Sequence, residues 1–341
     1  MIDRSTAPEG AAAVDELAAR LGPLARRHVA LGPLTTYGVG GPAALVATVP
    51  EEAALGDVAA ALGAVGAAVP VLVVGLGSNL LVADDGFPGL VVVLDAGLSE
   101  VAVESTTVRA GARAKLPVVA RQAANAGLTG FEWAAGVPGS VGGAVRMNAG
   151  VHESDMAAVL ARVRIVDLRS GEDVVVTASD LDLAYRSSSV QATQAVVWAE
   201  LALAPGDPDA GRAAIKEKTS WRRRHQPGGR NAGSVFTNPP EDSAGRLIEA
   251  AGLKGLRIGS AEVSAKHANF IQADEGGRAA DVWALMAEIR RRVRDHAGVD
   301  LHAETCVVGF DSDPEGNGGA GDSGGVAPVA PVASDGGRGS S

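Results

Sequence analysis

Two glycine-rich segments constrain this chain more than any other feature of its sequence. The first, GLGSN, covers residues 75–79, and the second, GVPGSVGGAVRMNAG, covers residues 136–150. Glycine makes up 45 of the 341 residues, roughly twice its usual share of about 7%. Because glycine is used where the backbone turns sharply or approaches another group closely, the chain must make many such turns or approaches.

The first segment resembles a Rossmann fingerprint only in part. It follows the apolar run 69–75, and Asp95 lies downstream at about the distance of a ribose-binding acid. However, Leu80 occupies the third glycine position, and ADDGFPG (83–89) contains turn signals where a helix should begin. We therefore predict no Rossmann domain here.

The second segment is the stronger indication of a bound cofactor. A backbone without bulky side chains can present successive N–H groups to a diphosphate, and serine hydroxyls add further donors. A glycine-rich loop that packs closely against another element is the alternative. The second Gly-Ser segment upstream favours cofactor binding.

Apolar periodicity predicts a mixed α+β chain in two units. In the first unit, strands are predicted at 44–49, 69–75, 90–95, 107–111, 163–168, 173–178 and 196–203, and helices at 11–21, after Pro50, and at 115–127. PGDPDAG (205–211) reads as a boundary. In the second unit, helices are predicted near 212–224, 243–251 and 278–296, and strands near 256–263, 268–273 and 304–310.

Composition and charge exclude several classes of protein. Cys306 is the single cysteine, and the six histidines lack metal-ligand spacing, so we predict no disulfide and no metal site. The N-terminus shows no secretory signal and no apolar run reaches 18 residues, which favours a cytoplasmic protein. With a net charge of −10, the chain is not expected to bind nucleic acid or membranes.

Ser234, within NAGSVFTNPP (231–240), is a candidate for chemistry. The prolines at 239 and 240 exclude a helix interior and a central strand, so we expect the serine on a loop or at a strand end. A nucleophilic serine usually lies in G-x-S-x-G, but Phe236 occupies the second glycine position. The residues alone therefore leave a structural and a catalytic role open.

Six segments occur in the order of one known family. They are PVLVVGLGSNLLVADDGFPGLVVVL (70–94), GVPGSVGGAVRMNAG (136–150), LAYRSSS (183–189), NAGSVFTNPP (231–240), RLIEAAGLKGLRIGSAEVSAKHANFI (246–271) and AET (303–305). In these segments the chain resembles the UDP-N-acetylenolpyruvoylglucosamine reductases, the MurB flavoenzymes of peptidoglycan precursor synthesis.

The resemblance implies a domain plan. It implies an N-terminal helix or extension (1–19), a two-subdomain FAD-binding region of the vanillyl-alcohol-oxidase type (20–205) and a smaller α+β substrate-binding domain (206–310). The remaining stretch, 311–341, is an acidic, Gly/Ser-rich tail that we expect to be disordered. We expect a monomer.

The resemblance also implies the reaction and its residues. NADPH reduces FAD, and the enolpyruvyl sugar nucleotide then takes up the hydride in the same cleft. Arg186 corresponds to the family's carboxylate-binding arginine, Glu304 to its catalytic glutamate and Ser234 to its proton donor. For Glu304 to serve as an acid, its pKa must be raised. A serine hydroxyl can protonate so strong a base as a carbanion-like intermediate.

Cofactor and substrate positions follow in the same way. The positions expected to bind FAD are Gly75, Gly77, Ser78, Asn79, Gly136, Pro138, Gly139, Ser140, Gly143 and Asn148. The positions expected to contact substrate are Tyr185, Asn238 and Lys266, and either Arg224 or His225 would supply a further basic contact. The short interval between Arg186 and Ser234 places the chain in the subclass without the tyrosine-loop insertion.

Two other functions remain as alternatives. One is an FAD-dependent oxidase of the same superfamily; such enzymes often tether the flavin through His or Cys, which neither glycine segment offers. The other is a nucleotide-binding module without catalysis, which the presence of Arg186, Ser234 and Glu304 disfavours.

Overall fold

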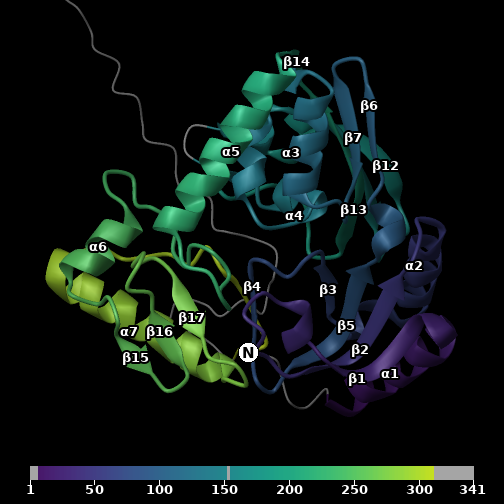
Figure 1. The fold of residues 1–341 in the computed structure, drawn as a ribbon. Coiled ribbons are helices and arrows are strands. Elements are labelled where there is room, and N and C mark those ends of the chain that lie inside the picture. Colours follow the sequence, from purple (N-terminus) through teal and green to yellow (C-terminus); the bar gives the residue numbers. More distant parts are fainter. Residues whose placement is uncertain (1–6, 152–153, 311–341) are drawn as a thin grey trace, which may run out of the picture.

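The computed structural model describes residues 7–151 and 154–310 (Figure 1). The tail predicted at 311–341 lies outside the described residues. The α-helices are α1 (Ala7–Leu21), α2 (Ala53–Val65), α3 (Leu116–Asn125), α4 (Val141–Arg146), α5 (Pro208–His225), α6 (Ala244–Ala250) and α7 (Ala279–Ala297). Within the described residues, no helix has the length and apolar character needed to cross a lipid bilayer.

The strands are mostly short. They are β1 (Ala25–Ala30), β2 (Pro42–Val49), β3 (Val71–Val74), β4 (Leu80–Val82), β5 (Phe87–Leu94), β6 (Val101–Glu104), β7 (Thr107–Gly111), β8 (Leu128–Thr129), β9 (Gly150–Val151), β10 (Ser154–Asp155), β11 (Leu160–Asp167), β12 (Asp173–Thr177), β13 (Gln194–Ala202), β14 (Ala204–Pro205), β15 (Arg257–Ile258), β16 (Ala261–Val263), β17 (Ile271–Ala273) and β18 (Cys306–Val308).

The first layer is a four-stranded sheet in the order β1-β2-β5-β3, flanked by α1 and α2 (Figure 1). Strands β2, β5 and β3 run parallel, whereas β1 pairs antiparallel with β2. The predicted apolar face of α1 is the one that is buried, since Val14, Leu17 and Leu21 belong to the core. Strands buried on both faces explain the continuous apolar runs in this part of the sequence.

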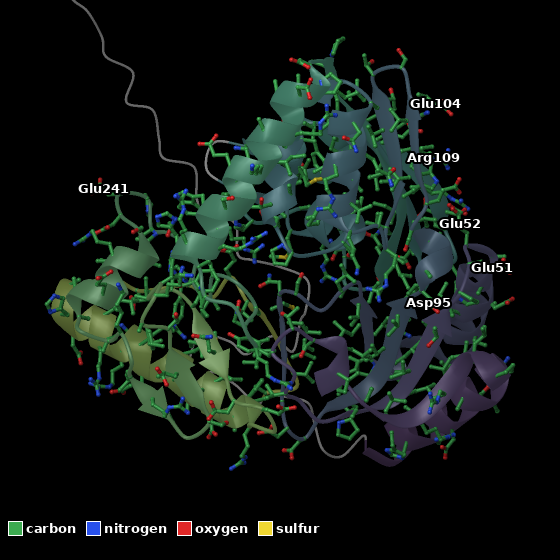
Figure 2. The ribbon with its side chains drawn as sticks, in the orientation of Figure 1. Glu51, Glu52, Asp95, Glu104, Arg109 and Glu241 are labelled. Carbon is green, nitrogen blue, oxygen red and sulfur yellow. The ribbon has the colours of Figure 1, made fainter. Side chains whose placement is uncertain are left out.

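The second layer is a five-stranded antiparallel sheet in the order β12-β11-β13-β7-β6. Helices α3, α4 and α5 lie on one side of it (Figure 1). The side chains of Glu104 and Arg109 lie at the outer side, away from these helices (Figure 2). Burial alternates in β12, at the edge of this sheet, whereas the central strand β13 is buried along most of its length.

The C-terminal unit packs the three-stranded sheet β15-β16-β17 against α7. The single strand predicted over 256–263 is wrong, because the chain turns back at Gly259 to form a β15–β16 hairpin. Gly259 has φ +52°, a conformation that glycine adopts at little cost. The carboxylate of Asp281 secures the turn by accepting a hydrogen bond from the Ser260 N–H at 2.8 Å.

The end of the described chain returns to the first unit. Strand β18 pairs in parallel with β4, with Cys306 opposite Leu80 and Val308 opposite Val82. Nearby, Leu81 and Tyr37 are buried in the core of the C-terminal unit. The two units therefore share both a strand pair and a hydrophobic core, and the cavity described next lies where they meet.

Candidate active site

A cavity of about 260 Å³ opens between the two units. Both glycine segments contribute to its wall, together with the C-terminal end of α5 and the segment 232–234. This volume lies just below the range of about 300–1,000 Å³ that is usual for pockets of drug-sized ligands. The predicted residues that line it are Gly75, Gly77, Ser78, Asn79, Gly136, Pro138, Gly139, Ser140, Gly143, Arg186, Ser234 and Glu304.

The first glycine segment is pressed against its neighbours. Gly77 has φ +60°, and a Cβ atom there would overlap the Leu34 carbonyl oxygen. The Gly77 carbonyl accepts a hydrogen bond from the Thr36 N–H at 3.0 Å. A Cβ atom at Gly75 would overlap the Ser140 hydroxyl, which belongs to the second segment. The two glycine segments therefore meet side by side only because position 75 carries no side chain.

The second glycine segment turns into a short helix at the cavity wall. Ser140 caps α4, its Oγ accepting a hydrogen bond from the Gly143 N–H at 3.4 Å. Gly139, just before the cap, has φ +147°, and its carbonyl accepts a bond from the Leu116 N–H at 3.1 Å. A Cβ atom built at Gly136 would meet nothing within 4 Å, so open space lies beside this backbone.

These residues fit an FAD. The walls are glycine backbone without side chains, the open space beside Gly136 suits a close-lying ligand, and two arginines, Arg146 and Arg222, reach the same cavity. Backbone N–H groups, a serine hydroxyl and guanidinium groups are the donors that a diphosphate takes. The residues that would hold the cofactor are those of the two glycine segments.

Arg186 and Glu304 form an ion pair in the cavity. The Arg186 Nε lies 2.7 Å from the Glu304 Oε1, and both side chains are about one-fifth exposed (20% and 18%). The second donor of the guanidinium, Nη2, binds the Gly150 carbonyl at 2.8 Å. Arg186 itself has φ +57°, an uncommon conformation for a residue with a side chain. Such strain is retained where the surroundings hold the residue in place.

The carboxyl group of Glu304 is subject to opposing effects. Burial raises its pKa because it disfavours the charged form, while the charge of Arg186 and the hydrogen bond from its guanidinium lower it. Burial prevails, and the pKa of Glu304 lies above its ordinary value. This is the direction that a proton-donating or proton-sharing carboxyl requires.

Ser234 lies on a loop, as predicted, and its neighbours tie it to Glu304. The Val235 carbonyl accepts a hydrogen bond from the Glu304 N–H at 2.8 Å, and Phe236 forms a β-bridge with Ala303. On the other side of Glu304, its carbonyl accepts a bond from the Asn79 Nδ2 at 2.9 Å. The first glycine segment, the glutamate and the serine are thus joined through short backbone connections.

A second cavity, of about 350 Å³, shares Ser234 with the first. Asn238 and Lys266, the predicted substrate contacts, line it. The Asn238 Oδ1 accepts a hydrogen bond from the Ala244 N–H at 3.0 Å, and the Lys266 ammonium donates to the Arg223 carbonyl. Basic side chains therefore gather in this second cavity, where an anionic ligand would be favoured.

Four predicted residues lie elsewhere. Tyr185 is 55% exposed and lines neither cavity, but its ring lies 4.9 Å from the Arg186 Cζ. Asn148 is buried outside the cavity wall, and its Nδ2 binds the Ala184 carbonyl at 2.9 Å, which supports the turn before Arg186. Neither Arg224 nor His225 reaches a cavity; the His225 ring stacks on Trp221 at 4.5 Å.

The basic residue that does reach the first cavity is Arg222, which the sequence reasoning missed. Its guanidinium donates to the Gly136 carbonyl, and burial lowers its pKa. Arg222 lies seven residues after the buried Ile215 and therefore on the same face of α5. This seven-residue spacing could have indicated from the sequence that Arg222 faces the interior. Arg146, Gln226 and Cys306 also line the first cavity without having been predicted.

Comparisons with known proteins agree with this geometry. A family model described as an FAD binding domain matches residues 44–177, and one described as the C-terminal domain of UDP-N-acetylenolpyruvoylglucosamine reductase matches residues 225–308. UDP-N-acetylenolpyruvoylglucosamine reductase 2 of Symbiobacterium thermophilum is 42% identical over 83% of this chain and 92% of its own length. The Rubrobacter xylanophilus reductase of the same name is 42% identical over 85% of this chain and 97% of its own length.

A solved structure gives the same result. The crystal structure of UDP-N-acetylenolpyruvylglucosamine reductase (MurB) from Thermus caldophilus is 36% identical to this chain, with a TM-score of 0.72. The match covers 84% of this chain and all of that one. The predicted fold class, an FAD-binding region followed by a smaller α+β domain, is confirmed. The chain belongs to the UDP-N-acetylenolpyruvoylglucosamine reductase family, the FAD-dependent oxidoreductases of peptidoglycan precursor synthesis.

Proposed function

We propose that the chain reduces the enolpyruvyl ether of UDP-N-acetylglucosamine-enolpyruvate to UDP-N-acetylmuramate, with NADPH as the electron source. The names of the relatives support the substrate. The observation that carries the proposal is that Arg186, Ser234 and Glu304 line one cavity with both glycine segments. Such a cavity offers a cation, a hydroxyl and a buried carboxyl beside a surface suited to FAD.

The reaction defines what the protein must provide. FAD, when bound, supplies the hydride that adds to the terminal methylene carbon of the enolpyruvyl group. Negative charge then develops on the neighbouring carbon and spreads into the substrate carboxylate. A fixed cation or acid must stabilise this charge, and a positioned proton donor must quench it.

Arg186 and Glu304 are suited to the first task. A guanidinium can bind a carboxylate through two parallel hydrogen bonds, and the bonds to Glu304 and Gly150 hold Arg186 at the cavity. Glu304, whose pKa burial raises, takes up a proton more readily than an exposed glutamate and can direct it to the substrate carboxylate. Both side chains are therefore already in place when negative charge develops on the substrate carboxylate, and this preorganisation stabilises the transition state.

Ser234 is suited to the second task. It borders both cavities, so a ligand spanning them would pass its hydroxyl. The carbon to be protonated is far more basic than an alkoxide, so the hydroxyl needs no lowered pKa. Delivery from one side also determines the configuration of the new lactyl ether.

The remaining assignments belong to the same proposal. Asn238 and Lys266 bind the sugar nucleotide in the second cavity, with Tyr185 above Arg186. The chain acts in the cytoplasm as a monomer of the subclass without the tyrosine loop. Its FAD-binding region ends near residue 205, and its substrate domain follows to residue 310.

The half-reactions test the proposal. The purified protein is expected to carry a flavin band near about 450 nm, which NADPH bleaches anaerobically and the enolpyruvyl sugar nucleotide restores. Ser234→Ala is expected to leave bleaching within about twofold and to slow restoration by about 10²–10⁴-fold, the usual contribution of a positioned proton donor. Rapid-mixing absorbance measures both rates. Equal slowing of both halves would exclude the role given to Ser234, and a protein that binds no FAD would exclude the function.

A further inference from the structure

Asn269 is a buried amide that none of the steps above uses. It is 3% exposed, and both polar atoms of its side chain bind the backbone of one residue. Its Oδ1 accepts from the Phe236 N–H at 3.0 Å, and its Nδ2 donates to the Phe236 carbonyl at 2.8 Å. Its own carbonyl accepts from the Val235 N–H at 2.9 Å. The amide thus replaces a partner strand beside the residues that follow Ser234.

The opposite side of the same segment is tied to the neighbourhood of Glu304. The Glu304 N–H donates to the Val235 carbonyl at 2.8 Å, and the Thr237 N–H donates to the His302 carbonyl at 2.9 Å. Residues 235–237 therefore lie between Asn269 on one side and residues 302–304 on the other. Ser234 is the residue immediately before this doubly bonded segment.

This arrangement controls where the Ser234 hydroxyl points. A serine side chain has a single torsion before its oxygen, so its aim depends mainly on its backbone. Proton transfer needs the donor within hydrogen-bond reach of the carbon, and a misplacement of about 1 Å can cost about 100-fold in rate. The bonds at Phe236 are buried, so removing the amide leaves its N–H and its carbonyl without their protein partners.

We propose that Asn269 is a positioning residue for the reduction: its side-chain amide holds the backbone at Phe236 so that the Ser234 hydroxyl faces the carbon to be protonated. The inference rests on the proposed function of Ser234. Asn269 acts through Ser234 and takes no part in the transfer of hydride from NADPH.

A plain structural role for Asn269 predicts different behaviour, and Ile271 provides the matched control. Ile271 lies two residues further along, is fully buried, and belongs to the core of the same unit. Ile271→Ala removes packing from the same core and leaves every side-chain hydrogen bond to residues 235–237 in place. If Asn269 only stabilises the fold, Asn269→Ala and Ile271→Ala will lower the melting temperature and change the rates in similar ways.

The experiment compares the two anaerobic half-reactions of the holoenzyme. For Asn269→Ala we expect flavin bleaching by NADPH within about twofold of the unaltered protein. Restoration by the enolpyruvyl sugar nucleotide should slow by about 10- to 100-fold, with little change in the substrate concentration at half-saturation. Asn269→Asp keeps the shape and one acceptor, so it should fold and show intermediate slowing. Ile271→Ala should retain both rates within about threefold.

A double variant separates action through Ser234 from general damage. Because two residues that serve the same step are not additive, Ser234→Ala/Asn269→Ala should restore the flavin within about twofold of Ser234→Ala alone. Hydrogen exchange adds a readout independent of turnover. The amide of Phe236 should exchange at least about tenfold faster in Asn269→Ala, less fast in Asn269→Asp, which keeps the acceptor for this N–H, and at the unaltered rate in Ser234→Ala.

The outcomes discriminate between the two proposals. If Ser234→Ala slows restoration while both Asn269 variants behave like Ile271→Ala, the positioning role is wrong and the proposed function stands. Multiplicative slowing in the double variant overturns the positioning role as well. If Ser234→Ala restores the flavin at the unaltered rate, the role of Ser234 fails and the inference fails with it.

Discussion

At the scale of single residues, burial and the neighbouring Arg186 guanidinium shift the pKa of the Glu304 carboxyl in opposite directions. The Glu304 carboxyl is shielded from water, and the contact with Arg186 only partly offsets the loss of hydration. A buried ion pair of this kind contributes little to stability. It is explained better as a preorganised binding element than as a support of the fold.

The pH dependence of stability follows from this environment. Because the folded protein holds the Glu304 proton more tightly than the unfolded chain does, this carboxyl weakens the fold as the pH rises above its ordinary pKa of 4.5. We expect Glu304→Gln to gain melting temperature relative to the unaltered protein between pH 4.5 and 8, and to lose that gain at lower pH. Thermal unfolding across this pH range measures the difference.

Glu288 offers a control of opposite sign. Hydrogen bonds and charge from Arg291 and Arg292 lower its pKa to about 2. Glu288 therefore stabilises the fold above its ordinary pKa, and the contribution disappears as the pH falls towards 2. Glu288→Gln should lose melting temperature at neutral pH and recover it in acid. Parallel pH profiles for the two variants would contradict the environment described for Glu304.

The sequence identified Ser234, Arg186 and Glu304 through the order of motifs, and the structure brings all three to one cavity. It could not identify Asn269, because an amide that replaces a partner strand has no signature in spacing or composition. The family resemblance placed Asn148 at the cofactor as part of the second glycine segment. The side chain instead points to the Ala184 carbonyl, which sequence order alone cannot reveal.

At the scale of elements, Arg222 connects α5 to the second glycine segment. Its guanidinium reaches the Gly136 carbonyl, so the end of the helix holds the loop that borders the cavity. The space beside Gly136 remains open. Loop and helix together form a wall of the cavity. Its shape depends on the absence of a side chain at Gly136 and on the position of the Arg222 guanidinium.

A methyl group at Gly136 tests this wall. Gly136→Ala meets no atom within 4 Å and has an ordinary φ, so the apoprotein should fold normally. The methyl group would occupy space that we assign to FAD, and we expect the dissociation constant to rise by about tenfold, equivalent to about 1.4 kcal/mol. Titration of apoprotein with FAD measures it. In Gly228→Ala the added methyl group also meets no atom within 4 Å, but this position lies outside the cavity wall. This control variant should bind FAD normally.

The longer elements were predictable and the shorter ones were not. The apolar runs at 44–49 and 90–95 became β2 and β5, because strands buried on both faces leave a continuous signal. The three-residue strand β4 and the six-residue helix α4 escaped notice. Their conformation is imposed by partners distant in sequence rather than by local periodicity.

At the scale of the whole molecule, the two units are not separable. Leu81, from the first unit, is buried in the core of the second, beside Tyr37. Strand β18 returns from the second unit to pair with β4. A boundary near residue 205 therefore separates two stretches of the sequence, but the folded units on either side share a core and a strand pair. Local composition could not have revealed these contacts between distant residues.

Shared packing predicts cooperative unfolding. We expect calorimetry to show one transition for the protein. Leu81→Ala should destabilise it by about 2–5 kcal/mol, as for other buried leucines. Leu55→Ala, in α2 and remote from the second unit, serves as the comparison. Both variants should lower the same transition, whereas separate peaks that respond to one variant each would mean that the units unfold independently.

The parallel pairing of β18 with β4 has a consequence for biosynthesis. Glu304 precedes β18 by a single residue, so the ribosome adds this carboxyl only after both glycine segments and Ser234. A truncated or unfinished chain would possess both glycine segments and Ser234 but no acid beside them. We expect such a chain to lose the β18–β4 strand pair as well as the carboxyl that faces Arg186.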